Sequence, residues 1–83
     1  MDAEYIYDIF ETTEKNGDPD LTIGLAKLKA DKPIPEGTTE KELCQFIGRH
    51  YHELVDAYAA HDRGAFEEAV LACEEQDAEK EAE

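Results

Sequence analysis

Apolar residues recur at helical spacing along most of the chain, and the first such segment is residues 2–15. Asp2 can cap the start of a helix here, and Asn16-Gly17 can end it in the left-handed conformation. A strand competes, because Tyr5, Tyr7 and Ile9 alternate and Asn16-Gly17 is also a hairpin signal. We expect the helix, because one face carries the stripe i, i+3, i+4 and i+7, and the acidic residues lie on the opposite face. The stripe is Ile6, Ile9, Phe10 and Thr13.

A second helix is expected after Asp18-Pro19-Asp20, which supplies an N-cap, a proline at the first helical position and acid in the first turn. Gly24 should weaken this helix by about 1 kcal/mol relative to alanine. Its apolar stripe is Leu21, Leu25 and Leu28, but alternation of Leu21, Ile23 and Leu25 also fits a strand. The alternative fold is therefore α+β, with a β-hairpin over residues 4–29 packed on two C-terminal helices.

The longest helix is predicted from Thr38 or Thr39 to about Ala60 or His61, and a fourth begins near Ala65 after the turn at residues 62–64. The third helix has a buried stripe flanked by Cys44, Phe46 and Val55, and the stripe is Leu43, Ile47, Tyr51, Leu54 and Tyr58. The fourth buries Phe66, Ala69, Val70 and Cys73. Residues 57–69 resemble the inter-helix turn of a tetratricopeptide repeat, which implies a helical hairpin and no function.

The predicted fold is thus all-α, a small single-domain bundle of about four short helices over residues 1–76. Residues 77–83 are expected to be an acidic C-terminal tail or a frayed helix end, because only alanine is apolar there. Eighty-three residues support one domain, and no apolar run approaches the ~20 residues of a membrane span. The acidic start, Met1-Asp2-Ala3-Glu4, is unlike a signal peptide, so we expect a cytoplasmic protein.

Candidate catalytic and metal-binding chemistry is sparse. The chain has no serine, which excludes serine-nucleophile mechanisms, and it has no glycine-rich phosphate loop. Cys44 and Cys73 are expected to be small core residues. Two histidines, His50 and His52, would point about 200° apart on a continuous helix, which is wrong for one ion. We therefore expect no enzyme activity, cofactor or metal, and no direct binding of nucleic acid.

The distribution of charge changes this picture. Residues 1–20 hold seven acidic side chains against Lys15 alone, and residues 64–83 hold eight against Lys80 alone. The 43 residues between them hold seven acids and six bases, so almost all of the net charge of −14 lies at the two ends. Salt adaptation would make the surface acidic throughout, so this distribution favours a specific interaction.

Acidic side chains at i, i+4 and i+7 of a helix are spaced like successive phosphates of one nucleic-acid strand. Such rows could occupy a basic nucleic-acid-binding groove of a partner protein and inhibit it. In size and charge the chain resembles the small acidic anti-restriction and anti-CRISPR proteins of phages, although no motif links it to a family. The predicted partner-binding residues are Glu4, Asp8, Glu11, Glu67, Glu68, Glu74 and Glu75.

The alternative function is that of a non-enzymatic α-helical adaptor or regulatory subunit, which would bind its partner through an apolar surface. Three apolar residues fall off the predicted core stripes, namely Tyr7, Ile23 and Ile34. An exposed cluster of these three would favour an adaptor or a homodimer.

Overall fold

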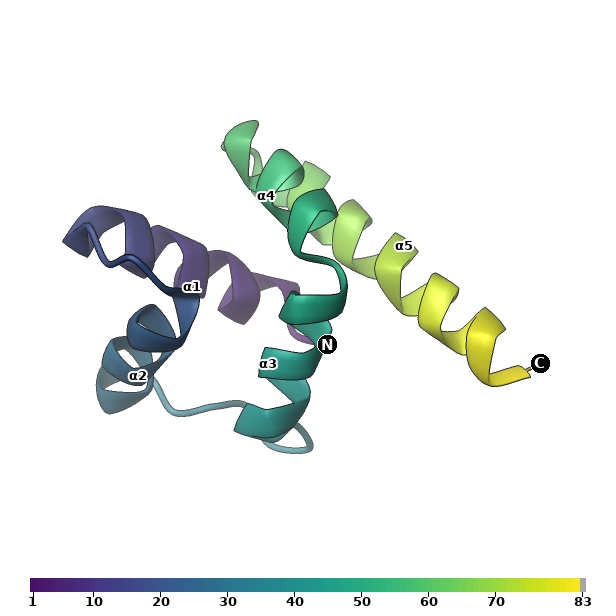
Figure 1. Cartoon of the computed structure of the whole chain (residues 1–83), viewed down its shortest axis with the longest axis horizontal. Coiled ribbons are helices and arrows are strands. Elements are labelled where there is room, and N and C mark those ends of the chain that lie inside the picture. The colour runs from purple at the N-terminus through teal and green to yellow at the C-terminus, as the bar shows by residue number, and fades with distance from the viewer. Residues whose placement is uncertain (83) are drawn as a thin grey trace.

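The protein is a bundle of helices. The computed structural model describes residues 1–82, and within them it has five helices and no strand. They are α1 (Ala3–Asn16), α2 (Leu21–Asp31), α3 (Glu40–Arg49), α4 (Tyr51–Ala59) and α5 (Arg63–Ala82). The all-α prediction is confirmed, and the alternative of a β-hairpin over residues 4–29 is wrong. In Figure 1 α1 and α2 lie on the left, α3 lies below α4, and the C-terminal end of α5 extends away from the other helices on the right.

The ends of α1 form as the sequence predicts, whereas α2 begins later. The Asp2 carboxylate accepts a hydrogen bond from the Tyr5 amide (3.1 Å), and Gly17 ends α1 with a φ of 68°. In α2 the cap is Asp20, whose carboxylate accepts from the Thr22 amide at 2.9 Å. Asp18, the predicted cap, instead accepts from the Lys27 ammonium at 2.8 Å.

The crossing of α1 and α2 depends on Gly24. A Cβ atom added to this glycine would lie 1.8 Å from the hydroxyl oxygen of Thr13 on α1 and 3.2 Å from the carbonyl oxygen of Ile9. Since two atoms that are not bonded cannot lie 1.8 Å apart, only glycine lets the two helices approach this closely. The residue that weakens α2 locally therefore permits its packing.

The single helix predicted over residues 38–61 is interrupted at His50, whose φ and ψ are −116° and 27°. The His50 amide still donates to the Phe46 carbonyl (3.1 Å), and its carbonyl accepts from the Leu54 amide (2.9 Å), so α3 and α4 share this residue as a junction. The change of direction turns Tyr51 outward, with 47% of its surface exposed. The prediction that Tyr51 is buried is therefore wrong.

The core also differs from the predicted stripes. Tyr7 is only 6% exposed, and its ring centroid lies 5.1 Å from that of Tyr58 and 5.3 Å from that of Phe66. It is buried because α1 packs against α5 as well as α2. Ile34 is half-buried against the core, and Ile23 is exposed. The apolar cluster expected of an adaptor therefore does not form from these three residues.

The two cysteines occupy different environments. Cys73 is buried on α5, as predicted, but Cys44 is exposed on α3. The prediction for Cys44 is wrong because α3 turns a narrower face to the core, consisting of Leu43, Phe46 and Ile47. Across residues 1–82, every helix is too short or too polar to span a membrane.

Candidate functional site

One of the acidic residues of α1 is engaged inside the protein. This residue is Asp8, whose carboxylate accepts from Lys32 at 3.0 Å and from Arg63 at 3.1 Å, and whose side chain is only 19% exposed. Burial alone would raise the pKa of this carboxyl, but the hydrogen bonds from Lys32 and Arg63 outweigh it and the pKa is lowered. Asp8 thus ties α1 to the end of α2 and the start of α5.

Arg63 also organises the surface around Asp8. Its guanidinium lies 4.4 Å from the ring centroid of Tyr7 and 3.9 Å from the Glu11 carboxylate. Glu11 remains 56% exposed, so this weak pair leaves much of its carboxylate accessible to solvent. Of the three predicted residues on α1, only Glu4 and Glu11 could meet a partner.

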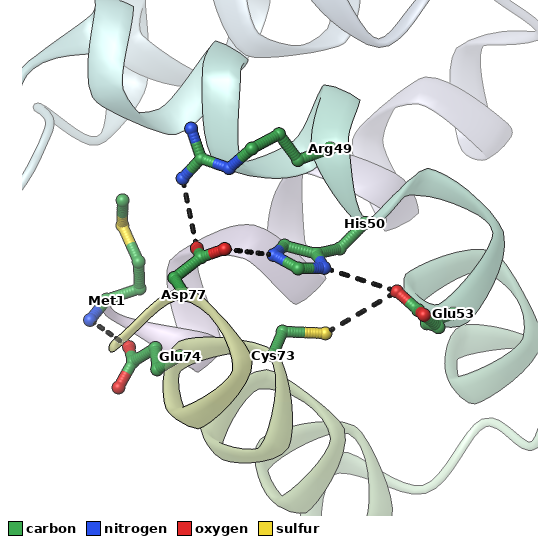
Figure 2. Close-up of polar contacts among 7 residues, drawn as sticks. All are labelled: Met1, Arg49, His50, Glu53, Cys73, Glu74 and Asp77. Atoms are coloured by element: carbon green, nitrogen blue, oxygen red, sulfur yellow. Dashed lines mark hydrogen bonds and ion pairs between the residues drawn. The ribbon is translucent and has the colours of Figure 1, made fainter. Parts of the chain in front are cut away.

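Glu4 and Glu67 meet at a shallow depression between the start of α1 and α5, here called the N-terminal depression. Its volume is about 340 Å³. The amino group of Met1, which lines the depression, forms an ion pair with Glu74 (Figure 2). Leu71 is the most exposed of the large apolar residues, at 52%. The lining residues are Met1, Asp2, Ala3, Glu4, Glu67, Val70 and Leu71.

The outer face of α5 is the most uniform acidic surface. We define it by Glu68, Glu75 and Glu79, which are all exposed and lie opposite the buried stripe of Phe66, Val70 and Cys73. Among the side chains described, those of residues 1–79, none forms an ion pair with these three. Helix geometry spaces them by about 10 and 6 Å along an axis of about 30 Å.

A second group of polar residues is partly buried where α3, α4 and α5 meet (Figure 2). His50 is 5% exposed, and its Nε2 lies 3.0 Å from Asp77 while its Nδ1 lies 3.2 Å from Glu53. The Glu53 oxygen that faces Nδ1 also accepts from the thiol of Cys73 at 3.9 Å. Arg49 donates to the other oxygen of Asp77 at 3.0 Å. These five residues are called the His50 cluster.

The acidity of two groups in the His50 cluster follows from these contacts. Burial would raise the pKa of Asp77, but hydrogen bonds from Arg49 and His50 outweigh it, and the pKa is lowered. Burial and the nearby charges of Glu53 and Asp77 raise the pKa of the Cys73 thiol to about 11. Cys73 is therefore a protonated thiol at neutral pH and is a poor nucleophile.

An apolar groove lies between α2 and α3, with a volume of about 310 Å³. Tyr51, which is 47% exposed at the start of α4, and Cys44 are among the residues that line it. We call it the α2–α3 groove, and its lining is Ile9, Pro19, Asp20, Leu21, Thr22, Leu25, Cys44, Ile47, Gly48 and Tyr51.

The seven predicted residues thus divide into separate groups. Glu4 and Glu67 come together, Glu68 and Glu75 share the outer face of α5, and Asp8 and Glu74 are held by internal ion pairs. Glu11 stands apart, exposed on α1 with one weak contact to Arg63. The sequence reasoning missed Leu71, although its position off the apolar stripe of α5 was a usable signal. No significant similarity to a protein family, a curated protein or a solved structure is found for this chain.

Proposed function

We propose that this protein is an interaction protein that binds a basic, nucleic-acid-binding surface of a partner protein through α5. The observation that carries the proposal is the outer face of α5, where three exposed carboxylates have no cationic partner among the described side chains. Such a surface offers a basic groove what a nucleic-acid backbone offers, namely a row of negative charge on a preformed scaffold. Binding would exclude the partner's nucleic acid.

The arrangement of α5 supports this proposal. Its first half is anchored by Phe66, Val70 and Cys73, and its C-terminal end extends beyond the other helices (Figure 1). An extended helix can enter a groove that the whole bundle could not enter. Carboxylates on a preformed helix also lose less conformational freedom on binding than those on a flexible tail.

Leu71 supplies an apolar contact beside this charge. It is 52% exposed, and Glu67 and Glu74 lie within one turn of it on the same flank of α5. Interfaces commonly combine an apolar anchor with a polar rim. We propose that Leu71 is the anchor and that the neighbouring Glu67 carboxylate aligns the partner, since Glu74 is held by the Met1 amino group.

The test is capture of partners on immobilised protein, with a wild-type chain and a variant in which the outer face of α5 is neutralised. Glutamine has nearly the same helix propensity as glutamate, so the variant should keep its fold. The variant is E68Q/E75Q/E79Q. With about 1 kcal/mol for each exposed charge pair, we expect about a 100-fold loss of affinity for the captured partner.

A matched control removes the same charge elsewhere. D31N/E36Q/D56N changes three exposed acids in the middle of the chain and should bind like the wild type. If both variants bind the partner as tightly as the wild type, a specific role for α5 is refuted. Equal loss in both would show that net charge alone drives the interaction.

The second candidate is an adaptor that docks a partner's apolar segment in the α2–α3 groove. The half-exposed ring of Tyr51, which lines the groove, favours it. Tyr51→Ala should then abolish binding, and salt should have little effect. Under the main proposal, Tyr51→Ala binds normally.

A further inference from the structure

We infer that His50, Glu53 and Cys73 form a binding site for a single zinc ion, with Asp77 orienting the histidine. This site is independent of the proposed partner surface on the outer face of α5. A nitrogen, an oxygen and a sulfur ligand atom from these three residues all lie within 4.8 Å of one another. They come from the α3–α4 junction, α4 and α5, so an ion would connect these elements.

The separations of the three ligand atoms are close to those around a tetrahedral ion. Zinc bonds to nitrogen, oxygen and sulfur measure about 2.0 to 2.3 Å, which separates neighbouring ligand atoms by about 3.3 to 3.5 Å. In the protein, Nδ1 of His50 lies 3.2 Å from the Glu53 oxygen, and Sγ of Cys73 lies 3.9 Å from the same oxygen. The third separation, between Nδ1 of His50 and Sγ of Cys73, is within 4.8 Å, so binding an ion requires these two side chains to close by up to about 1 Å.

Asp77 has the position of the carboxylate that commonly supports a metal-binding histidine. Its oxygen lies 3.0 Å from Nε2 of His50 and is fixed through its second oxygen by Arg49 (Figure 2). When Nε2 carries the proton and donates a hydrogen bond to Asp77, Nδ1 is unprotonated, and its lone pair is directed at Glu53 and Cys73. Such supporting carboxylates orient the ring and strengthen it as a ligand.

The chemistry and the accessibility of the three ligands also fit zinc. A mixed set of imidazole, carboxylate and thiolate suits this borderline ion, whereas magnesium and calcium prefer oxygen alone. His50 and Cys73 are buried, but the Glu53 side chain is 55% exposed, so an ion can enter from that side and keep one water ligand. On binding, the Cys73 thiol loses its proton to solvent, the sulfur donates its electron pair to the ion, and the ion releases water.

The test uses Co²⁺ as a spectroscopic probe on the full chain, followed by displacement with Zn²⁺. A thiolate ligand gives a charge-transfer band in the near ultraviolet that carboxylates do not give, so the many surface acids cannot imitate it. We expect one Co²⁺ per chain with this band, and loss of the band when Zn²⁺ is added. The absence of a thiolate band would overturn the inference.

Variants locate the site, and each has a matched control. Cys73→Ser should abolish the band, whereas Cys44→Ala, which alters the exposed cysteine, should keep it. A band that follows Cys44 instead would also overturn the inference. Because Glu53 is exposed, Glu53→Gln tests the site without disturbing the core, and Asp56→Asn on the same helix is its control.

The supporting role of Asp77 has its own readout. Asp77→Asn should keep the charge-transfer band but weaken Co²⁺ affinity by about 10- to 100-fold, as expected for a residue that orients a ligand. Glu53→Gln should weaken affinity by at least as much. Unchanged affinity in Glu53→Gln would remove the carboxylate from the site and refute the three-residue assignment.

Discussion

The close crossing of α1 and α2 makes Gly24→Ala a sharp test of the fold. Alanine is the better helix former, and on an unhindered helix this change stabilises by about 1 kcal/mol. At position 24 the new methyl group would lie 1.8 Å from Oγ1 and 2.9 Å from Cβ of Thr13. The packing argument and the propensity argument therefore predict opposite signs.

The steric effect should prevail because Thr13 cannot easily move. Its side chain is buried, and its hydroxyl donates to the Ile9 carbonyl at 2.8 Å. Overpacking of this kind costs about 1–3 kcal/mol, and loss of the hydrogen bond costs about 1 kcal/mol more. After the gain in propensity, we expect Gly24→Ala to lower the free energy of unfolding by about 1–3 kcal/mol.

Urea unfolding followed by far-ultraviolet circular dichroism measures this change, and Gly48→Ala is the matched control. A Cβ at Gly48 would meet nothing within 4 Å, so that variant should be more stable than the wild type. Combining Gly24→Ala with Thr13→Ala should cost less than the sum of the two changes, because the closest clash disappears. A Gly24→Ala protein as stable as the wild type would refute the observed crossing.

Three further predictions concern charge and the cysteines. Because the pKa of Asp8 is lowered in the folded protein, its contribution to stability is present above about pH 4 to 5 and is lost as the pH falls through the pKa of the folded state. Asp8→Asn should therefore lower the free energy of unfolding by about 1 kcal/mol at pH 7 and by less in acid, as measured by urea unfolding at several pH values. A thiol reagent should modify exposed Cys44 quickly and buried Cys73 only on unfolding, which mass spectrometry of the labelled chain would show; equal rates would contradict the burial of Cys73. Neutralising the outer face of α5 should leave thermal stability unchanged or slightly raised, because Glu75 and Glu79 repel each other at i and i+4, and a fall in Tm would mean that these acids have structural partners.

Local signals predicted the helices well where they act alone. The Asp2 cap and the Gly17 stop of α1 are properties of short segments, and both occur as predicted. The stripe of α5 was equally readable, because Phe66, Val70 and Cys73 follow one face of a helix. These features need no knowledge of what packs against them.

The junction at His50 could not be read in the same way. No proline interrupts residues 38–61, and the sequence there is continuous with a single helix. The bend accompanies contacts of the His50 ring with Glu53 and with Asp77, which is 27 positions away. Tyr51 was misplaced for this reason, and the sequence argument against a metal assumed the same straight helix.

The acidic ends posed a similar problem. Their charge can be counted from the sequence, but the counting does not show which acids have internal partners. Asp8 is held by Lys32 and Arg63, which are distant in sequence, whereas Glu68 has no described cationic neighbour. The two ends are therefore not equivalent, and the proposed site moves from both helices to α5.

The central claim is that α5 competes with nucleic acid for a basic surface, and competition at several salt concentrations tests it most directly. The measurement is the affinity of the wild-type chain and of E68Q/E75Q/E79Q for the captured partner, with and without added DNA or RNA. We expect nucleic acid to displace the wild-type protein, and its affinity to fall steeply as the Debye length shrinks from about 10 Å at 0.1 M salt to about 3 Å at 1 M. A partner that binds both proteins equally, at all salt concentrations and in the presence of nucleic acid, would contradict the account.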